Sequence, residues 1–393
     1  SPTPTPTPTP TPQWIDFEVQ LPDEFVPGEA IVVLTREAFE QQKIYEIIRY
    51  FRDMGIEISI KEQSPPPLRS YLLKVPLGKE KDVVDILNKI KEEIKQFGIE
   101  FGQPNLRLRI LASTPNDPLW NLQWGLKRIN VEKAWDAYGQ GSHEIIVAVV
   151  DTGVDYKHPE LANNYHSGKD FVNFDDDPMD DNGHGTGMAG TIAAKINNGR
   201  GIAGIADVSI IAVKVMNARG IGDGWRAGLG IFHAANNGAK VINLSLGIPY
   251  LGFGEVFMDI AARFANWRGA IVIAAAGNDN GRVNYPAKHE SVIAVGALDT
   301  NDKRWMYSNQ GPELDLVAPG VDIPLTYKNG DYRRSSGTSI AAAHVSGVAA
   351  LLWSSDPSQT NDDVKNKLFE YVQPMGSSDE YGKGIVMAFP QQE

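Results

Sequence analysis

Five short, continuous apolar runs most strongly constrain what the larger part of this chain can fold into. From about residue 116 onward, Gly-rich loops and helical stretches separate the segments EIIVAVVD, VSIIAVKVM, AKVINLSLG, GAIVIAAAGN and SVIAVGAL. Strands that are apolar on both faces must be covered on both sides, as in a parallel sheet with helices above and below it. The pattern therefore predicts an α/β domain with a doubly wound, mostly parallel sheet.

The preceding region, residues 28–112, has a different texture that predicts a small α+β unit. Strands are expected at AIVVL, IEISI, YLLKV and NLRLRIL, most of which alternate apolar with polar residues. Two stretches with apolar residues at helical spacing, within residues 44–51 and 83–94, separate these strands. The resulting order, βαββαβ, is that of the ferredoxin-like fold, which by itself indicates no function.

A third segment, residues 1–27, begins with SPTPTPTPTPTP. Alternating Pro and Thr offer nothing to bury, so this linker and lead-in is expected to be extended and semi-rigid. The first residue is Ser and no signal peptide is visible, so we expect a processed or trimmed form. The three parts are therefore expected at residues 1–27, 28–112 and 113–393.

Composition argues against several classes of protein. The formal net charge of −12 gives little electrostatic support for nucleic-acid binding. No apolar run approaches the roughly 18 residues that a membrane helix needs, so no membrane span is expected. The chain has no cysteine, which excludes a disulfide framework and a thiolate zinc site. We expect a monomeric globular protein.

Three polar residues stand where functional groups gather in an open α/β sheet, beyond the carboxyl ends of strands. Asp151 follows a Val- and Ala-rich run, where it is either a turn residue or a buried carboxylate with a partner. His184 lies between glycines at the start of a small-residue stretch, and a lone histidine is more often structural. Ser339 opens an apolar stretch of helical length, where it is either an N-cap or a nucleophile at a helix N-terminus.

Taken together, these residues indicate nucleophilic catalysis. A hydroxyl is a weak nucleophile until a base removes its proton, and histidine suits that task near neutral pH. A buried carboxylate holds the imidazole in the correct tautomer. Asp151, His184 and Ser339 appear in a chain order known for such triads. Asn278, which follows Gly277, either forms a turn or donates to an oxyanion together with the backbone N–H of Ser339.

At these positions the chain resembles the subtilisin-like serine proteases, or subtilases, and among them the thermitase-like members. The motifs DTG, HGT, AAGN and GTS surround Asp151, His184, Asn278 and Ser339, and NLSLG, NYPA and LVAPG also resemble family segments. The likeness spans roughly residues 117–390. It implies a serine endopeptidase in which Ser339 is the nucleophile, His184 the base and acid, Asp151 the orienting residue and Asn278 an oxyanion donor.

The resemblance also implies a cleft that binds an extended protein substrate by strand pairing. Its expected substrate-binding residues are Gly220, Ile221, Gly222, Ser245, Leu246, Gly247, Ala275, Ala276 and Gly277. The sequence departs from the family pattern at Gly187, where His is frequent, and at Ala343, where Pro is frequent. Neither position carries the chemistry.

The N-terminal unit then resembles the propeptide that subtilases use as a folding aid and as an intramolecular inhibitor. Its C-terminal tail would be RILASTPN, and self-cleavage is expected within residues 111–114. The alternative is a binding module without an inhibitory role. The resemblance thus implies a secreted, self-processing zymogen.

Structural calcium is a further expectation, in one or two sites, whereas no catalytic metal is expected. An acidic loop before His184 resembles a family calcium loop, although such a loop can also be simply solvated. Its candidate ligands are Asp170, Asn173, Asp175 and Asp177. A second, discontinuous site implied by the resemblance would use Asp117, Glu160, Ile196, Asn198, Arg200 and Ile202.

Two other classes of function compete with the protease. A catalytically silent binding protein would reuse the same fold, but the complete set of four site residues argues against it. A serine esterase of the α/β-hydrolase type requires G-x-S-x-G, and a P-loop enzyme requires G-x-x-x-x-G-K-[ST]. Neither pattern occurs in this chain.

Overall fold

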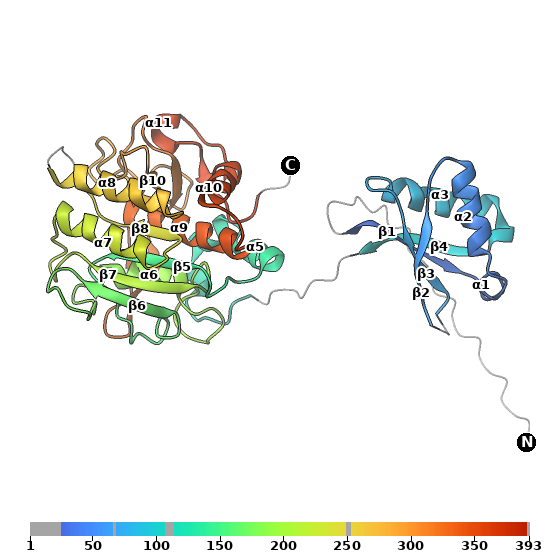
Figure 1. Cartoon of the computed structure of the whole chain (residues 1–393), viewed down its shortest axis with the longest axis horizontal. Helices are drawn as coiled ribbons and strands as arrows, with labels where there is room; N and C mark the ends of the chain where they lie inside the picture. Colours follow the sequence, from blue (N-terminus) through green and yellow to red (C-terminus); the bar gives the residue numbers. More distant parts are fainter. Residues whose placement is uncertain (1–24, 66–67, 107–113, 249–252, 391–393) are drawn as a thin grey trace, which may run out of the picture. The chain divides into compact units, whose positions relative to one another are not determined.

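The structure is a computed structural model that describes residues 25–65, 68–106, 114–248 and 253–390 (Figure 1). These residues form two compact units, one before and one after residues 107–113 in the sequence. Most of the expected linker at 1–27, and most of the expected cleavage region at 111–114, lie outside the described residues.

The N-terminal unit has the ferredoxin-like fold that the sequence predicts. Its elements are β1 (Phe25–Leu34), α1 (Arg36–Glu40), α2 (Ile44–Asp53), β2 (Ser59–Gln63), β3 (Ser70–Lys74), α3 (Glu80–Glu93), η1 (Lys95–Phe97) and β4 (Ile99–Leu106). The strands pair antiparallel in the order β2-β3-β1-β4. Apolar side chains of β1, β3, α2 and α3 form one buried core, among them Val32, Phe51, Leu73 and Leu87.

The fourth strand differs from the sequence prediction. We expected it at residues 105–111, but β4 runs over Ile99–Leu106, and residues 107–111 lie outside the described part. Gly102 and Pro104 interrupt the apolar pattern of this segment and argue against a strand. Because β4 is an edge strand that pairs only with β1 among the described strands, it tolerates a proline that a central strand would exclude.

The C-terminal unit contains a nine-stranded sheet in the order β14-β15-β11-β10-β9-β8-β5-β7-β6. Its described strands are parallel except for the pairing of β14 with β15. The strands are β5 (Ile146–Asp151), β6 (Tyr165–Asp170), β7 (Ser209–Lys214), β8 (Val241–Leu244), β9 (Ile271–Ala275), β10 (Ile293–Leu298), β11 (Leu316–Pro319), β14 (Val372–Gln373) and β15 (Ile385–Val386). The five apolar runs of the sequence form β5, β7, β8, β9 and β10, which are neighbours at the centre of this sheet.

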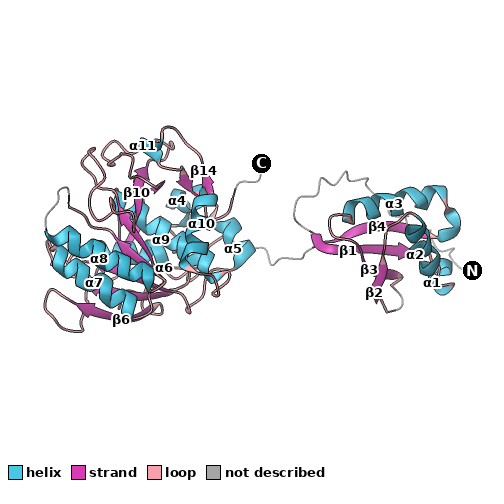
Figure 2. Cartoon of the chain, turned by 45° about the horizontal axis from the view of Figure 1, so that its top comes forward, coloured by secondary structure: helices cyan, strands magenta, loops and turns pink. Residues whose placement is uncertain are grey.

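Helices cover both faces of the sheet, which confirms the doubly wound prediction (Figure 2). Helices α7 (Gly224–Asn236) and α8 (Phe253–Trp267) pack against each other on one side, and α6 (His184–Ala193) and α9 (Thr338–Ser354) pack on the other. Between its first turn and Trp353, α9 is buried all round, because its apolar and small residues leave no polar face. No described helix is both long enough and apolar enough to span a membrane.

Further elements of this unit lie outside the nine-stranded sheet and the four helices named above. They are η2 (Trp120–Leu122), α4 (Trp124–Arg128), α5 (Val131–Tyr138), β12 (Ile323–Tyr327), β13 (Asp331–Ser335), α10 (Asn361–Glu370) and α11 (Ser378–Tyr381). Strands β12 and β13 form an antiparallel hairpin of their own. From β5 the chain goes to β6 and β7 on one side and then to β8 on the other, so the sheet order reverses at β5. Sites in such sheets gather at the carboxyl end of this point.

Candidate active site

Asp151 and His184 are paired at the carboxyl end of β5. Asp151 is the last residue of that strand and is fully buried, and its Oδ1 accepts a hydrogen bond from Nδ1 of His184 over 2.8 Å. The backbone N–H of Thr152 donates to the same oxygen at 2.7 Å. This arrangement assigns the proton of the neutral imidazole to Nδ1 and leaves Nε2 as a base.

The pKa of His184 reflects two opposing effects. Burial disfavours the charged imidazolium, but the negative charge of Asp151 and its hydrogen bond outweigh burial. The charge of Asp180 acts in the same direction, so the pKa of His184 is raised above its usual value. A base with a raised pKa accepts a proton more readily, which suits a group that must take one from a hydroxyl.

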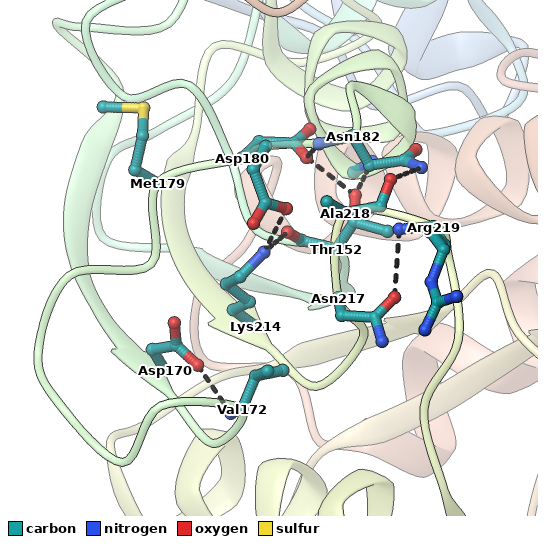
Figure 3. A network of polar contacts seen from close by, with 12 residues as sticks. Thr152, Asp170, Val172, Met179, Asp180, Asn182, Lys214, Asn217, Ala218 and Arg219 are labelled. Carbon is teal, nitrogen blue, oxygen red and sulfur yellow. Dashed lines mark hydrogen bonds and ion pairs between the residues drawn. The ribbon is translucent and has the colours of Figure 1, made fainter.

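Asp180 links the residue after Asp151 to the helix that carries His184 (Figure 3). Its buried carboxylate accepts the Thr152 hydroxyl at 2.9 Å and the backbone N–H of Gly183 at 2.8 Å. It also accepts the N–H and the hydroxyl of Thr186, at 2.9 Å and 2.6 Å. Asp180 thus binds N–H groups that the first turn of α6 leaves free. Asp180 was not predicted as a site residue, although its place just before a helix start was a signal.

Lys214 supports the same region from β7 (Figure 3). It ends the strand, is 2% exposed, and donates to the Thr152 carbonyl at 2.6 Å and to Asp181 at 2.7 Å. A buried ammonium is costly without partners, and these two acceptors provide them. Lys214 was not predicted either, although a lysine within the apolar run VSIIAVKVM was a signal.

Ser339 is the second residue of α9, and it shares a cavity with His184 and Asn278. The cavity has a volume of about 430 Å³. Within the described residues, the Ser339 hydroxyl donates to the carbonyl of Ser245 at 3.3 Å rather than to the imidazole. Hydrogen bonds of catalytic groups are often loose before substrate binds, and rotation about one side-chain bond redirects this hydroxyl.

Asn278 is oriented by Thr338, the residue before Ser339. Its Oδ1 accepts both the backbone N–H and the hydroxyl of Thr338, each at 2.9 Å. This assignment of the amide leaves Nδ2 free to donate. A Cβ placed on Gly337 would lie 3.7 Å from that Nδ2 and 3.9 Å from the backbone nitrogen of Ser339. The side-chain amide of Asn278 and the backbone N–H of Ser339 therefore both lie near Gly337, at the start of α9.

The structure brings together six of the nine predicted substrate-binding residues. Gly220, Ile221, Gly222, Ser245, Leu246 and Gly247 line a second cavity of about 440 Å³, which His184 also lines. Ala275, Ala276 and Gly277 line neither of these two cavities. The first two of them are buried, and an added Cβ on Gly277 would collide with Asn309 and Asn284. Their role in substrate binding remains a prediction.

Comparison with known proteins places this geometry in a family. The model of the subtilase family matches residues 142–384. The chain belongs to the subtilase family. It is 36% identical over 362 residues to the thermophilic serine proteinase of Bacillus sp. (strain AK1), which covers 91% of this chain and 85% of that protein.

Two further relatives support the same assignment to the subtilase family. Thermitase of Thermoactinomyces vulgaris is 44% identical over 252 residues, which are 63% of this chain and 88% of thermitase. Subtilisin Savinase of Lederbergia lenta is 40% identical over 270 residues, 68% of this chain and 97% of the relative. The subtilase is therefore a thermitase-like serine endopeptidase, as the motifs predict.

Packing gives a reason for one of the two departures from the family pattern in this subtilase. A Cβ on Gly187 would lie 3.3 Å from both Leu325 and the carbonyl of Thr326, which are residues of β12. Helix α6 therefore packs closely on the β12–β13 hairpin. Ala343 is buried in α9, which continues without interruption past it. With Gly187 and Ala343 at these two positions, His184 still hydrogen-bonds to Asp151.

One candidate calcium site is assembled in part. Asp117 and Glu160 are buried, at 3% and 1% exposure, and both bind the loop that contains Asn198. Asp117 accepts the N–H of Asn198 at 3.1 Å, and Glu160 accepts its side-chain amide at 2.7 Å. Burial raises the pKa of Glu160, with the charge of Asp117 adding to the effect. Buried carboxylate oxygens of this kind are ligands that a hard cation such as Ca²⁺ prefers.

The same loop contains the other three predicted ligands, and a residue of β13 also contacts Glu160. Ile196, Arg200 and Ile202 belong to the same loop, and the N–H of Ile202 donates to Glu160 at 3.0 Å. The hydroxyl of Tyr332, from β13, donates to Glu160 at 2.9 Å. Tyr332 was not predicted, because it lies far from the loop in the sequence.

The acidic loop before His184 is arranged differently. Asp170 is buried and accepts the backbone N–H and the side-chain amide of Asn173, each at 2.9 Å. Asp175 and Asp177 are exposed. Over the described residues, no three His, Asp or Glu side chains gather as a metal site. The four predicted ligands therefore do not converge in this structure.

Proposed function

We propose that this subtilase is a secreted zymogen that cleaves proteins through an acyl-enzyme on Ser339. One observation carries the proposal above all. His184 is held by Asp151 at 2.8 Å and lines the same cavity as Ser339 and Asn278. The proposed nucleophile, base and oxyanion donor thus line one cavity, and the proposed orienting residue holds the base from β5, where the sheet order reverses.

The first step forms the acyl-enzyme. The Ser339 Oγ attacks the carbonyl carbon of the scissile bond, and its proton passes to Nε2 of His184. The carbonyl oxygen becomes an oxyanion that accepts from Nδ2 of Asn278 and from the N–H of Ser339. The buried carboxylate of Asp151 stabilises the imidazolium. The tetrahedral intermediate collapses when His184 returns the proton to the leaving amine.

The second step releases the acyl product. Water attacks the ester carbonyl, His184 accepts its proton, and the same two donors bind the new oxyanion. The Ser339 oxygen then leaves and regains a proton from His184. The enzyme is restored, and the net reaction adds one water across the peptide bond.

The N-terminal unit is proposed to be the propeptide of this zymogen. Its ferredoxin-like fold precedes the peptidase unit, as the resemblance to subtilases implies. The match to the Bacillus thermophilic serine proteinase covers 91% of the chain, so it extends into this unit. We propose that Ser339 cleaves the chain within residues 111–114 and that the released unit then inhibits the enzyme.

Calcium is proposed at the site formed by Asp117, Glu160 and Asn198, with main-chain carbonyls of Ile196, Arg200 and Ile202 as further ligands. The donors are oxygen atoms and two of the side chains are buried carboxylates, which is the chemistry that Ca²⁺ prefers. Calcium bound here would stabilise the folded state in a chain that has no cysteine. A second ion in the loop of Asp170 remains a prediction from the resemblance.

Mass spectrometry of the full chain and of its Ser339→Ala variant, each incubated with calcium, tests the proposal. We expect the parent to release a fragment that ends within residues 111–114 and the variant to remain whole. A serine-directed fluorophosphonate should label the parent but not the variant. If both chains remain whole and unlabelled, and neither digests an unfolded protein, the silent binding protein becomes the better hypothesis.

A further inference from the structure

The cavity that contains Ser339 is cationic in an otherwise acidic protein. Among the described residues that line it, the charged side chains are Arg333 and Arg334, and none is Asp or Glu. The chain as a whole carries a formal net charge of −12. The cavity lined by residues 220–222 and 245–247 has the opposite charge, because Asp223 is the charged side chain among its described lining residues.

Arg333 is held in place by an aromatic ring. It lies on β13, and its guanidinium stacks on Tyr327 of β12, 3.6 Å from the ring centroid. Stacking of this kind leaves the edge of the guanidinium able to donate. The hydroxyl of Tyr327 donates to the carbonyl of Asn182 at 2.8 Å, and its ring lies against Gly183. The cation is thus fixed to the segment that leads into His184.

The two arginines differ in their partners. Arg334 pairs with Asp322 at 2.6 Å, which partly neutralises it. No carboxylate of the described residues lies within ion-pair distance of Arg333. The nearest acid in the hairpin register is Asp331, opposite Tyr327, and its carboxylate accepts the N–H of Tyr332 at 2.8 Å. Arg333 is therefore the cation that remains available to a ligand.

The position of this cavity indicates which part of a substrate it meets. His184 must protonate the leaving amine, so the peptide beyond the scissile bond passes the imidazole. Residues 220–222 and 245–247 are proposed to hold the acyl side in their own cavity. The cavity with Arg333, which also contains Met188 of α6, then receives the first residues of the leaving peptide. This step rests on the proposed function.

We propose that Arg333, assisted by Arg334, selects substrates with an acidic side chain at the first or second residue after the scissile bond. A guanidinium binds a carboxylate through two parallel hydrogen bonds and repels an ammonium. Arg333 is exposed, so the preference is modest: about 3- to 5-fold for Glu over Gln, the size of an exposed ion pair. The preference over Lys is larger because repulsion adds to it.

The test uses internally quenched peptides that differ only in having Glu, Gln or Lys at these two positions. The measured quantity is the ratio of kcat/KM for the Glu and Lys peptides, so any general loss of activity cancels. We expect Arg333→Gln to reduce this ratio to near one and Arg334→Gln to reduce it less. Arg263→Gln, an exposed arginine on α8, is the matched control and should keep the parent ratio. The parent ratio should fall as salt is added.

The outcomes separate this proposal from the proposed function. Cleavage of all peptides without a preference for Glu, or an unchanged ratio in Arg333→Gln, overturns the role of Arg333 and leaves the endopeptidase intact. Failure to cleave any peptide, together with no fluorophosphonate labelling of Ser339, removes the endopeptidase and the Arg333 proposal with it. A Glu preference that persists in both arginine variants would assign selection to another part of the cleft.

Discussion

The carboxylate of Asp180 accepts the hydroxyl of Thr152 at 2.9 Å, and this bond connects the strand that ends in Asp151 to the helix that begins with His184. The same carboxylate binds backbone N–H groups at the start of α6. Its negative charge also helps to raise the pKa of His184. Asp180 is therefore a positioning residue that acts through geometry and through charge.

Replacing Asp180 by Asn should lower kcat/KM by about 10- to 100-fold, the range expected when catalytic groups shift slightly. It should also move the acid limb of the pH profile to lower pH. His184 works as a base only when neutral, and loss of a nearby negative charge lowers its pKa. Thr152→Ser keeps the hydroxyl and should behave like the parent. A variant that loses activity with an unmoved acid limb would show that Asp180 acts through structure alone.

Removing the oxyanion donor should affect turnover more than substrate binding. In subtilisin, a member of the same family and the source of this figure, loss of the oxyanion asparagine costs about 10²–10³ in turnover. We expect Asn278→Ala to lower kcat to a similar extent with little change in KM. Thr338→Val removes one of the two bonds that orient Asn278 and should cost less. A rise in KM at constant kcat would contradict an oxyanion role.

Chelation of calcium should lower the thermal stability of the Ser339→Ala protein, which cannot digest itself. An ion present at 100 times its Kd contributes about 2.7 kcal/mol, which corresponds to roughly 5 °C in Tm for a unit of this size. Glu160→Gln should reduce the difference between the Tm values with calcium and with chelator. Asp362→Asn, exposed on α10, should leave it unchanged. Equal Tm values for the Ser339→Ala protein in both conditions would exclude a stabilising ion.

His344 should make the folded state less stable in acid. It is fully buried in α9, and burial lowers its pKa to about 4, whereas an unfolded chain has a value near 6.5. The unfolded state therefore binds the proton first as the pH falls. The contribution is complete above about pH 6.5 and is lost progressively toward pH 4, and it amounts to about 3 kcal/mol.

Denaturant unfolding of Ser339→Ala protein between pH 4 and pH 7 measures this effect. His344→Gln in the same background cannot gain a charge, yet it keeps a donor for the carbonyl of Ile340. Its free energy of unfolding should depend less steeply on pH across this window. Identical slopes with and without His344 would show that other groups dominate acid unfolding.

Much of the fold could be read from local patterns, because each pattern has a local cause. A strand that is apolar on both faces can bury both of them only between two layers of helices. The five continuous apolar runs accordingly form the five central strands. Alternation and helical spacing produced the ferredoxin-like unit, apart from β4, where Pro104 masks an edge strand. The four residues of the candidate site were also recognisable, because their motifs carry a known chemistry in a known order.

The sequence by itself determined the layers of the fold, the chain order of the elements in the N-terminal unit and the types of the groups that do chemistry. Only the tertiary structure decided which distant residues support them. Asp180 meets Thr152, Tyr332 meets Glu160, and Arg333 stacks on Tyr327 beside Gly183. Such contacts have no period and no motif, because they depend on where separate strands and helices end after packing. Local patterns are encoded by neighbouring residues in the chain. The composition of a site instead depends on which ends of strands and helices the packed core brings close together.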